Sequence, residues 1–152
     1  MLPVPNRYTL VAAAAEGKKE LTAFDQALLK AGIGNVNLLR VSSILPPGAE
    51  YTPALAVPPG SLVPIAYGSL VSEEKGSLIA AAVAVGVAAK DFGVIMEFAG
   101  YCRQREAEDR VREMIEEAFA YRGMKLQEIK VIGVEHRVIH CGCVFAGVPL
   151  WY

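Results

Sequence analysis

The longest apolar run in the chain, residues 78–89, limits what the rest of the sequence can build around it. A helix that crosses a membrane needs roughly 20 apolar residues, so this run is too short for one. Its many alanines are compatible with a helix or a strand, but Gly86 and the valines disfavour a helix. The sequence therefore predicts a strand over residues 78–87.

The other apolar patterns predict a mixed fold. Two segments have helical spacing and are followed by glycine, which often ends a helix: residues 21–31 and residues 106–122. Strand-like segments occupy residues 8–15, 36–44, 62–72, 92–99, 128–139 and 141–148. Two packed sheets with a helix on each outer face would bury the apolar faces of these elements. We therefore expect a single α+β domain over residues 1–152, built as a four-layer αββα sandwich.

Composition narrows the classes of partner. The chain of 152 residues is 53% hydrophobic and 20% charged, which is apolar for a monomer and favours an oligomer. The formal net charge of −1 provides no basic field for nucleic acid or for an anionic membrane. Residues 1–7 lack an apolar signal segment, so we expect a cytoplasmic protein. Cys141 and Cys143 have no second pair to complete a zinc site, so we expect buried reduced thiols.

A serine pair, Ser42-Ser43, stands between a predicted strand and the turn signal of residues 46–48. By itself, a serine pair at a strand end is ordinary. Residues 35–50 as a whole, however, closely resemble the self-processing segment of the pyruvoyl-dependent arginine decarboxylases. Further segments that resemble this family are residues 21–37, 64–68, 94–97, 111–114, 134–136 and 150–152. The resemblance covers nearly the whole chain and implies the same four-layer sandwich.

The resemblance implies that the chain cuts itself between Ser42 and Ser43. Attack of the Ser43 Oγ on the carbonyl carbon of Ser42 would convert the peptide bond into an ester. Elimination and hydrolysis would then leave a pyruvoyl group on residue 43, separating a β chain (residues 1–42) from an α chain (residues 43–152). The implied reaction converts L-arginine to agmatine and CO2 through an imine with the pyruvoyl group, without pyridoxal phosphate or a metal.

Asp25 is the candidate for the group that selects the substrate. Leu21 and Leu29 flank it on the predicted helix, with Leu28 close by, so its carboxylate should lie partly buried at the edge of the apolar stripe. A partly buried carboxylate needs a cation. An ion pair with Arg40, or with an arginine of another helix, would meet this need. The resemblance implies instead that Asp25 binds the guanidinium of the substrate.

Glu97 is the only charged residue between Phe92 and Tyr101. A glutamate in an apolar strand tends to have a raised pKa, which suits a proton donor near neutral pH. The same pattern also fits an outward-facing glutamate on a half-exposed strand. The resemblance implies that Glu97 is the catalytic acid.

Asn37 alternates with Leu39, Val41 and Ser43 onto one face of a predicted strand. The separation from Asn37 to Ser43 is about 20 Å in an extended chain, so the two cannot touch within one copy. If Asn37 serves catalysis, as the resemblance implies, it would reach Ser43 of a neighbouring copy, in agreement with the trimer of the family. Four further residues would line the substrate pocket by their place in the motif: Leu28, Gly34, Val36 and Ile44.

Two alternatives stay open on the sequence. The chain could decarboxylate another cationic amino acid, or it could be an uncleaved, non-catalytic trimer with a ligand-binding or structural role. A gel of the purified protein separates the enzyme, with two chains, from the uncleaved protein, with one. Glu135 and His136 match the family pattern without a role that the sequence reveals, and a histidine in a strand is usually satisfied structurally.

Overall fold

The strand expected at residues 78–87 forms the centre of a four-stranded sheet. The computed structural model describes all residues 1–152. In it, β7 (Leu78–Val87) pairs antiparallel with β8 (Gly93–Gly100) on one side and with β9 (Glu128–Arg137) on the other. A short strand, β4 (Ile44–Leu45), extends this sheet beside β8.

β7 is buried on both faces from residue 79 to residue 86. Its larger side chains point toward a second sheet and join the core there: Ile79, Val83 and Val85. Its alternate positions are alanines that pack beneath helix α2 (Gln104–Arg122): Ala80, Ala82 and Ala84. Gly86 continues this small-residue face, because a Cβ there would lie 2.6 Å from side-chain atoms of Ile115 and Phe119. Small residues on one face of β7 therefore allow α2 to lie close to the sheet.

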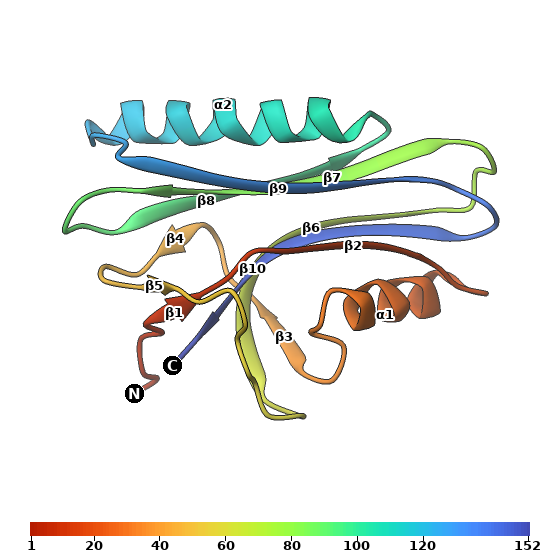
Figure 1. Cartoon of the computed structure of the whole chain (residues 1–152), viewed down its shortest axis with the longest axis horizontal. Helices are drawn as coiled ribbons and strands as arrows, with labels where there is room; N and C mark the ends of the chain where they lie inside the picture. The colour runs from red at the N-terminus through yellow and green to blue at the C-terminus, as the bar shows by residue number, and fades with distance from the viewer.

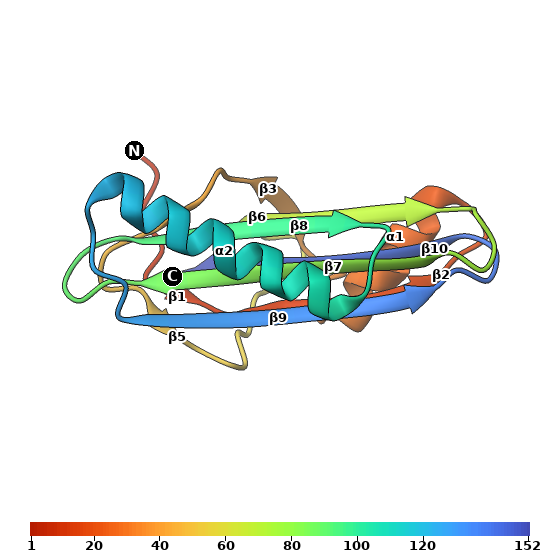
Figure 2. The same ribbon diagram turned by 90° about the horizontal axis from the view of Figure 1, so that it is seen from above.

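Helix α2 agrees closely with the helix expected at residues 106–122. It packs through Val111, Ile115 and Phe119, and it ends at Gly123, whose φ of 62° is the left-handed conformation that glycine adopts readily. α2 lies on the outer face of the four-stranded sheet (Figure 1) and runs obliquely across β8, β7 and β9 (Figure 2). Neither of the two helices in the chain is long and apolar enough to cross a membrane.

The second sheet has six strands, in the order β3-β6-β10-β1-β5 with β2 also paired to β10. β3 pairs with β6, and β1 with β5, in parallel, and the other pairs are antiparallel. The bounds of these strands are β1 (Arg7–Tyr8), β2 (Val11–Glu16), β3 (Asn37–Arg40), β5 (Glu50–Tyr51), β6 (Leu62–Ser72) and β10 (Gly142–Trp151).

Helix α1 (Glu20–Lys30) covers the outer face of the six-stranded sheet (Figure 1). Its buried side chains, Ala23, Ala27 and Leu28, pack with Phe145 of β10. The inner faces of the two sheets meet in one apolar core that includes Val83 of β7 and Val144 of β10. The expected α+β class, with two helices and two sheets, is confirmed.

The single strand expected at residues 36–44 is wrong. The structure divides it into β3, which belongs to the six-stranded sheet, and β4, which belongs to the four-stranded sheet. The residues between them carry the chain from one sheet to the other. Local β-propensity does not specify which strand supplies the hydrogen-bond partners, so the sequence pattern missed this change of sheet.

Glu16, at the end of β2, contacts the connection between β9 and β10, where the chain passes from the four-stranded to the six-stranded sheet. Its carboxylate accepts hydrogen bonds from the backbone N–H groups of His140 (2.8 Å), Cys141 (3.1 Å) and Ile139 (3.2 Å). His136 Nε2 lies 2.6 Å from Glu16 Oε2. Burial alone would raise the pKa of Glu16, but these hydrogen bonds together lower it to about 2.

The pair Glu135 and His136 thus has structural partners on both sides. Glu135 Oε1 accepts a hydrogen bond of 3.0 Å from the backbone N–H of Gln104, at the beginning of α2, while His136 contacts Glu16. The first N–H groups of a helix have no partner within the helix, so Glu135 satisfies one of them. The expectation that this histidine is satisfied structurally is confirmed.

We expect Glu16→Gln to lower the free energy of unfolding by about 1–3 kcal/mol at pH 7, because it weakens a cluster of charge-assisted hydrogen bonds. Since folding lowers the pKa of Glu16, its stabilising effect is present above pH 4.5 and is lost as the pH falls toward 2. Denaturant unfolding of the Ser43→Ala chain, which we expect to stay uncut, measures both effects. Glu73→Gln, an exposed carboxylate without a hydrogen bond, is the control. Equal unfolding midpoints for the Glu16 and Glu73 variants would contradict a stabilising role of the hydrogen bonds to Glu16.

Candidate active site

The serine pair lies where the backbone crosses from one sheet to the other. Before the crossing, the backbone N–H of Val41 makes the last hydrogen bond to the six-stranded sheet, 3.0 Å to the carbonyl oxygen of Ile65. The carbonyl oxygen of Ser43 accepts the first hydrogen bond from the four-stranded sheet, 2.7 Å from the backbone N–H of Ile95. Ser42 is exposed and its carbonyl oxygen accepts no hydrogen bond within the chain. The bond between Ser42 and Ser43 therefore joins two ends that are anchored to different sheets.

Glu97 faces the space between the two sheets. It shares its face of β8 with Ile95 and Ala99, which contribute to the core between the sheets, whereas its sequence neighbours on β8 pack toward α2. The alternative of an outward-facing glutamate is therefore wrong. Opposite it, Gly68 of β6 has no side chain, and a Cβ there would lie 3.4 Å from the Cβ of Glu97. The same Cβ would lie 3.3 Å from the backbone of Phe98, so the glycine allows β6 and β8 to lie close together at this point.

The carboxyl group of Glu97 has no hydrogen bond or ion pair within the chain, and Glu97 is only partly exposed. Burial raises the pKa of Glu97, and the nearby charge of Arg40 opposes this rise. A raised pKa was expected from the apolar strand and is confirmed. The pairing of β4 with β8 places Glu97 near the serines. Because this antiparallel pairing sets Ile44 opposite Val94, Ser43 lies opposite Ile95, which is two positions before Glu97 on β8.

Asp25 does not have the environment that its spacing suggested. The flanking leucines are exposed, with 77% of Leu21 and 43% of Leu29 accessible to solvent, and Asp25 is exposed with them. The buried face of α1 is formed by the small residues Ala23 and Ala27 together with Leu28. The expectation of a partly buried carboxylate is therefore wrong for the single chain. Asp25 also forms no ion pair with Arg40 or with any other cation.

Three further expected site residues, Gly34, Val36 and Asn37, lie between the end of α1 and the first residue of β3. Asn37 is exposed and its Nδ2 donates a hydrogen bond of 3.1 Å to the carbonyl oxygen of Gly60. Gly34 packs so closely under α1 that a Cβ would lie 2.5 Å from the side chain of Leu29. Val36 borders a cavity of about 280 Å³ between this connection and the loop of residues 53–59.

The expected site residues thus form two groups. The crossover group comprises Ser42, Ser43, Ile44 and Glu97, which the structure brings together at the edge where the chain changes sheets. The helix-side group comprises Asp25, Leu28, Gly34, Val36 and Asn37, which lie on α1, on the connection after it and at the first residue of β3. The helix-side group ends at the first residue of β3 and the crossover group begins beyond the last, so a single chain does not bring them together.

Two residues near the crossover group escaped the sequence analysis as site components. Arg40 donates a hydrogen bond of 2.6 Å to the carbonyl oxygen of Tyr67, and its guanidinium carbon lies 4.3 Å from the centre of the Tyr67 ring. Tyr67 in turn stacks on Phe145, with ring centres 5.1 Å apart. Arg40 is the only basic residue in residues 35–50, which was the signal available in the sequence.

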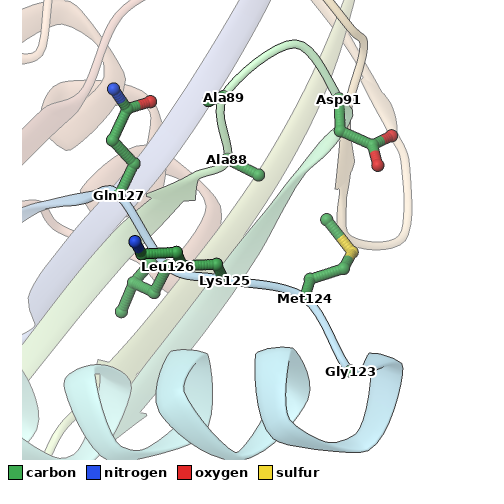
Figure 3. A pocket seen from close by; sticks show the side chains of 8 residues that line it. All are labelled: Ala88, Ala89, Asp91, Gly123, Met124, Lys125, Leu126 and Gln127. Atoms are coloured by element: carbon green, nitrogen blue, oxygen red, sulfur yellow. The ribbon is translucent and has the colours of Figure 1, made fainter.

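A cavity of about 500 Å³ lies elsewhere, between the β7–β8 turn and the segment that joins α2 to β9 (Figure 3). None of the expected site residues lines it: Ala88, Ala89, Asp91, Gly123, Met124, Lys125, Leu126 and Gln127 form its walls. The chain has no cluster of three or more His, Cys, Asp or Glu side chains that could hold a metal ion. All three cysteines are free, and Cys141 and Cys143 are buried as expected.

Comparisons with known proteins point in one direction. A family described as pyruvoyl-dependent arginine decarboxylase (PvlArgDC) matches residues 7–150 of the chain. A protein of Methanocaldococcus jannaschii with the name pyruvoyl-dependent arginine decarboxylase is 51% identical over 152 residues, covering 98% of this chain and 92% of the relative. A protein of Pyrococcus horikoshii with the same name is 49% identical over 134 residues, covering 86% of this chain and 85% of the relative.

Proposed function

The chain belongs to the pyruvoyl-dependent arginine decarboxylase family, and from that premise we propose that it cuts itself between Ser42 and Ser43 and converts L-arginine to agmatine and CO2. The observation that carries the proposal is the position of the serine pair at the change of sheets, beside a half-buried carboxyl group on β8. Mass measurement of the purified protein, together with an assay for agmatine, tests both halves of the proposal.

Self-cleavage suits this location because both ends keep their anchors. Ser43 supplies the Oγ nucleophile, and the exposed carbonyl of Ser42 is free of competing hydrogen bonds. After the cut, residues 1–42 stay paired through β3, and residue 43 stays attached to the N–H of Ile95 through its own carbonyl oxygen. A pyruvoyl group derived from Ser43 fits here, since the bond to Ile95 involves the carbonyl of residue 43 rather than the atoms that change.

Glu97 is the proposed proton donor. The pyruvoyl carbonyl supplies the electron sink that allows CO2 to leave the substrate. The former α-carbon must then receive a proton, and Glu97 lies two positions along β8 from the residue opposite Ser43. Burial between the sheets favours its protonated form near neutral pH, so its carboxyl group can deliver the proton without relying on water.

Substrate selection requires the helix-side group of a second copy. Asp25 offers a carboxylate with no partner of its own, and a carboxylate can bind a guanidinium through two parallel hydrogen bonds. Asp25 shares the exposed surface of α1 with Leu21 and Leu29, and two further exposed leucines stand on β3 and β6: Leu39 (47% exposed) and Leu62 (60% exposed). Exposed apolar residues of this kind favour burial by another subunit. We therefore expect a trimer in which the helix-side group of one copy, including Asn37, meets the crossover group of the next.

The two helices outside two facing sheets support the four-layer αββα sandwich, folded as a single domain over residues 1–152 before the cut. The small chain would then consist of residues 1–42 and the large chain of residues 43–152, as one αβ unit of the trimer. The functional group is the pyruvoyl group, and the proposed reaction uses neither pyridoxal phosphate nor a metal.

We expect Ser43→Ala to leave one uncut chain without decarboxylase activity, because the nucleophile for the acyl shift is gone. Ser42→Ala should still be cut, since residue 42 contributes only its carbonyl. Mass spectrometry of the three purified proteins measures the outcome directly. An uncut Ser42→Ala chain beside a cut wild type would show that the Ser42 hydroxyl takes part in the shift. A single uncut wild-type chain would overturn the proposed function and favour a non-catalytic protein.

We expect Glu97→Gln to reduce turnover of arginine by about 10²–10⁴, the usual contribution of a positioned general acid, because the amide cannot donate the proton in the same way. Since the donor must be protonated, wild-type turnover should fall as the pH rises through the raised pKa of Glu97. Turnover is measured only on chains whose mass proves that they carry the pyruvoyl group. Glu113→Gln, an exposed glutamate of α2, is the control. Near-wild-type turnover in Glu97→Gln would assign the proton to water or to another group.

We expect Asp25→Asn to be cut normally but to raise the KM for arginine by about 10–100-fold, because a charged hydrogen-bonded pair with the substrate is lost. Steady-state kinetics on the cut protein, with arginine and with other cationic amino acids, measure this effect. Glu20→Gln, another exposed carboxylate of α1, is the control. An unchanged KM would remove Asp25 from the substrate site.

Co-expression of Asp25→Asn and Glu97→Gln chains extends this test to the shared site. An interface that combines the wild-type Asp25 of one copy with the wild-type Glu97 of another contains no substitution. Mixed trimers should therefore recover part of the activity that each variant lacks. No recovery in trimers shown by mass to be mixed would place both residues within a site of one copy.

A further inference from the structure

Arg40 holds a fixed position at the end of β3, where the chain leaves the six-stranded sheet. The backbone of β3 pairs with β6 only as far as Arg40 and Ile65. Beyond this point the side chain of Arg40 continues along the edge of β6 and donates to the carbonyl oxygen of Tyr67 at 2.6 Å, with its guanidinium over the Tyr67 ring. Two different contacts with one residue restrain the guanidinium more than a hydrogen bond alone would.

The peptide unit between Tyr67 and Gly68 links this anchor to the surroundings of Glu97. The carbonyl that Arg40 contacts belongs to the peptide unit that joins Tyr67 to Gly68. A Cβ on Gly68 would point toward Glu97 and lie 3.4 Å from its Cβ. No ion pair within 4.0 Å joins the two charged side chains, so Arg40 acts on Glu97 through space. The other residues that face Glu97, Gly68 of β6 and Val83 of β7, carry no charge. Arg40 is the charged group that influences the pKa of Glu97, and it lowers that pKa against the effect of burial.

We propose that Arg40 is a positioning residue for the decarboxylation: held against Tyr67, one residue from the glycine that faces Glu97, its positive charge stabilises the carboxylate left after proton delivery. This inference rests on the proposed function, in which the Glu97 carboxyl group gives its proton to the former α-carbon of the substrate. That transfer leaves a half-buried carboxylate, and a proton from solvent restores the acid before the next turnover. Without a neighbouring cation, burial would disfavour the carboxylate and make Glu97 a weaker donor.

An arginine suits this position better than a lysine for a physical reason. The planar guanidinium can stack on the Tyr67 ring and donate in its own plane to a carbonyl at the same time, while the charge remains spread over the group. The amino group of a lysine would retain the charge but not this fixed geometry. Arg40 also precedes the cut, so the small chain would supply a charge that acts on a carboxyl group of the large chain.

The titration of Glu97 itself tests the proposal without a pyruvoyl group. In the uncut Ser43→Ala chain, labelled with ¹³C at the glutamate carboxyl carbons, the signal that disappears in Glu97→Gln identifies Glu97. Arg40→Gln removes the charge and retains a hydrogen-bond donor, and it should shift the titration midpoint of this signal to higher pH. Arg40→Lys should leave the midpoint nearer to that of the parent chain. Arg110→Gln is the matched control, because Arg110 stacks on Phe98 at 4.5 Å on the α2 side of β8.

Kinetics on the cut enzyme provide the second measurement. In Arg40→Gln the basic limb of the pH profile of kcat should move to higher pH, and the plateau of kcat should fall several-fold with little change in the KM for arginine, because a weaker acid transfers its proton more slowly. An active wild type with an unchanged Glu97 midpoint in Arg40→Gln would overturn this proposal and leave the proposed function intact. If Arg40→Gln does not fold, Arg40→Met, which retains an unbranched side chain against Tyr67, replaces it. Failure of both to fold would make Arg40 a purely structural residue and would also overturn the proposal.

Discussion

The burial of β7 on both faces determines where the other elements can lie. β7 carries alanines on the face toward α2 and larger side chains on the face toward the second sheet. The helix therefore lies close to one face, and a sheet covers the other. β8 is fixed by its pairing with β7, and this pairing sets the direction in which each β8 side chain points. Glu97 faces the inter-sheet space for this reason, although nothing in its immediate sequence selects that face. The position of the carboxyl group therefore follows from the packing of its neighbour.

Strong local patterns in the sequence predicted the strand at β7 and the helix at α2 well. β7 is a continuous apolar run that contains Gly86, and α2 has apolar residues at helical spacing with Gly123 at its end. Such patterns indicate the element whatever surrounds it in the fold. The segment from Asn37 to Leu45 also has a clear β pattern, yet its two halves pair with different sheets. Propensity describes how extended the backbone is. The choice of partner strand depends on contacts between residues distant in the sequence, which no local pattern contains.

For the candidate site too, the features that depend on neighbouring residues in the sequence could be predicted, and those that depend on distant residues could not. The serine pair and the isolated Glu97 could be singled out from the sequence, because each is unusual among its neighbours. The surroundings of Asp25 could not, since the spacing of Leu21 and Leu29 is the same whether the leucines pack in the core or against another subunit. The contact between Arg40 and Tyr67 joins residues far apart in the sequence and was also inaccessible. The charge that opposes the effect of burial on the pKa of Glu97 therefore comes from a residue that no local pattern connects with it.

In the six-stranded sheet, strands from before residue 42 pair with strands from after it. This pairing affects how the protein would refold after a cut between residues 42 and 43. The small chain would contain β1, β2 and β3, which pair with β5, β6 and β10 of the large chain, so neither chain alone has a complete sheet. Before the cut, refolding is a unimolecular search. After it, recovery from denaturation becomes a second-order encounter between two incomplete chains and depends on their concentration. Cleavage would thus make the persistence of the protein depend on how slowly the two chains separate.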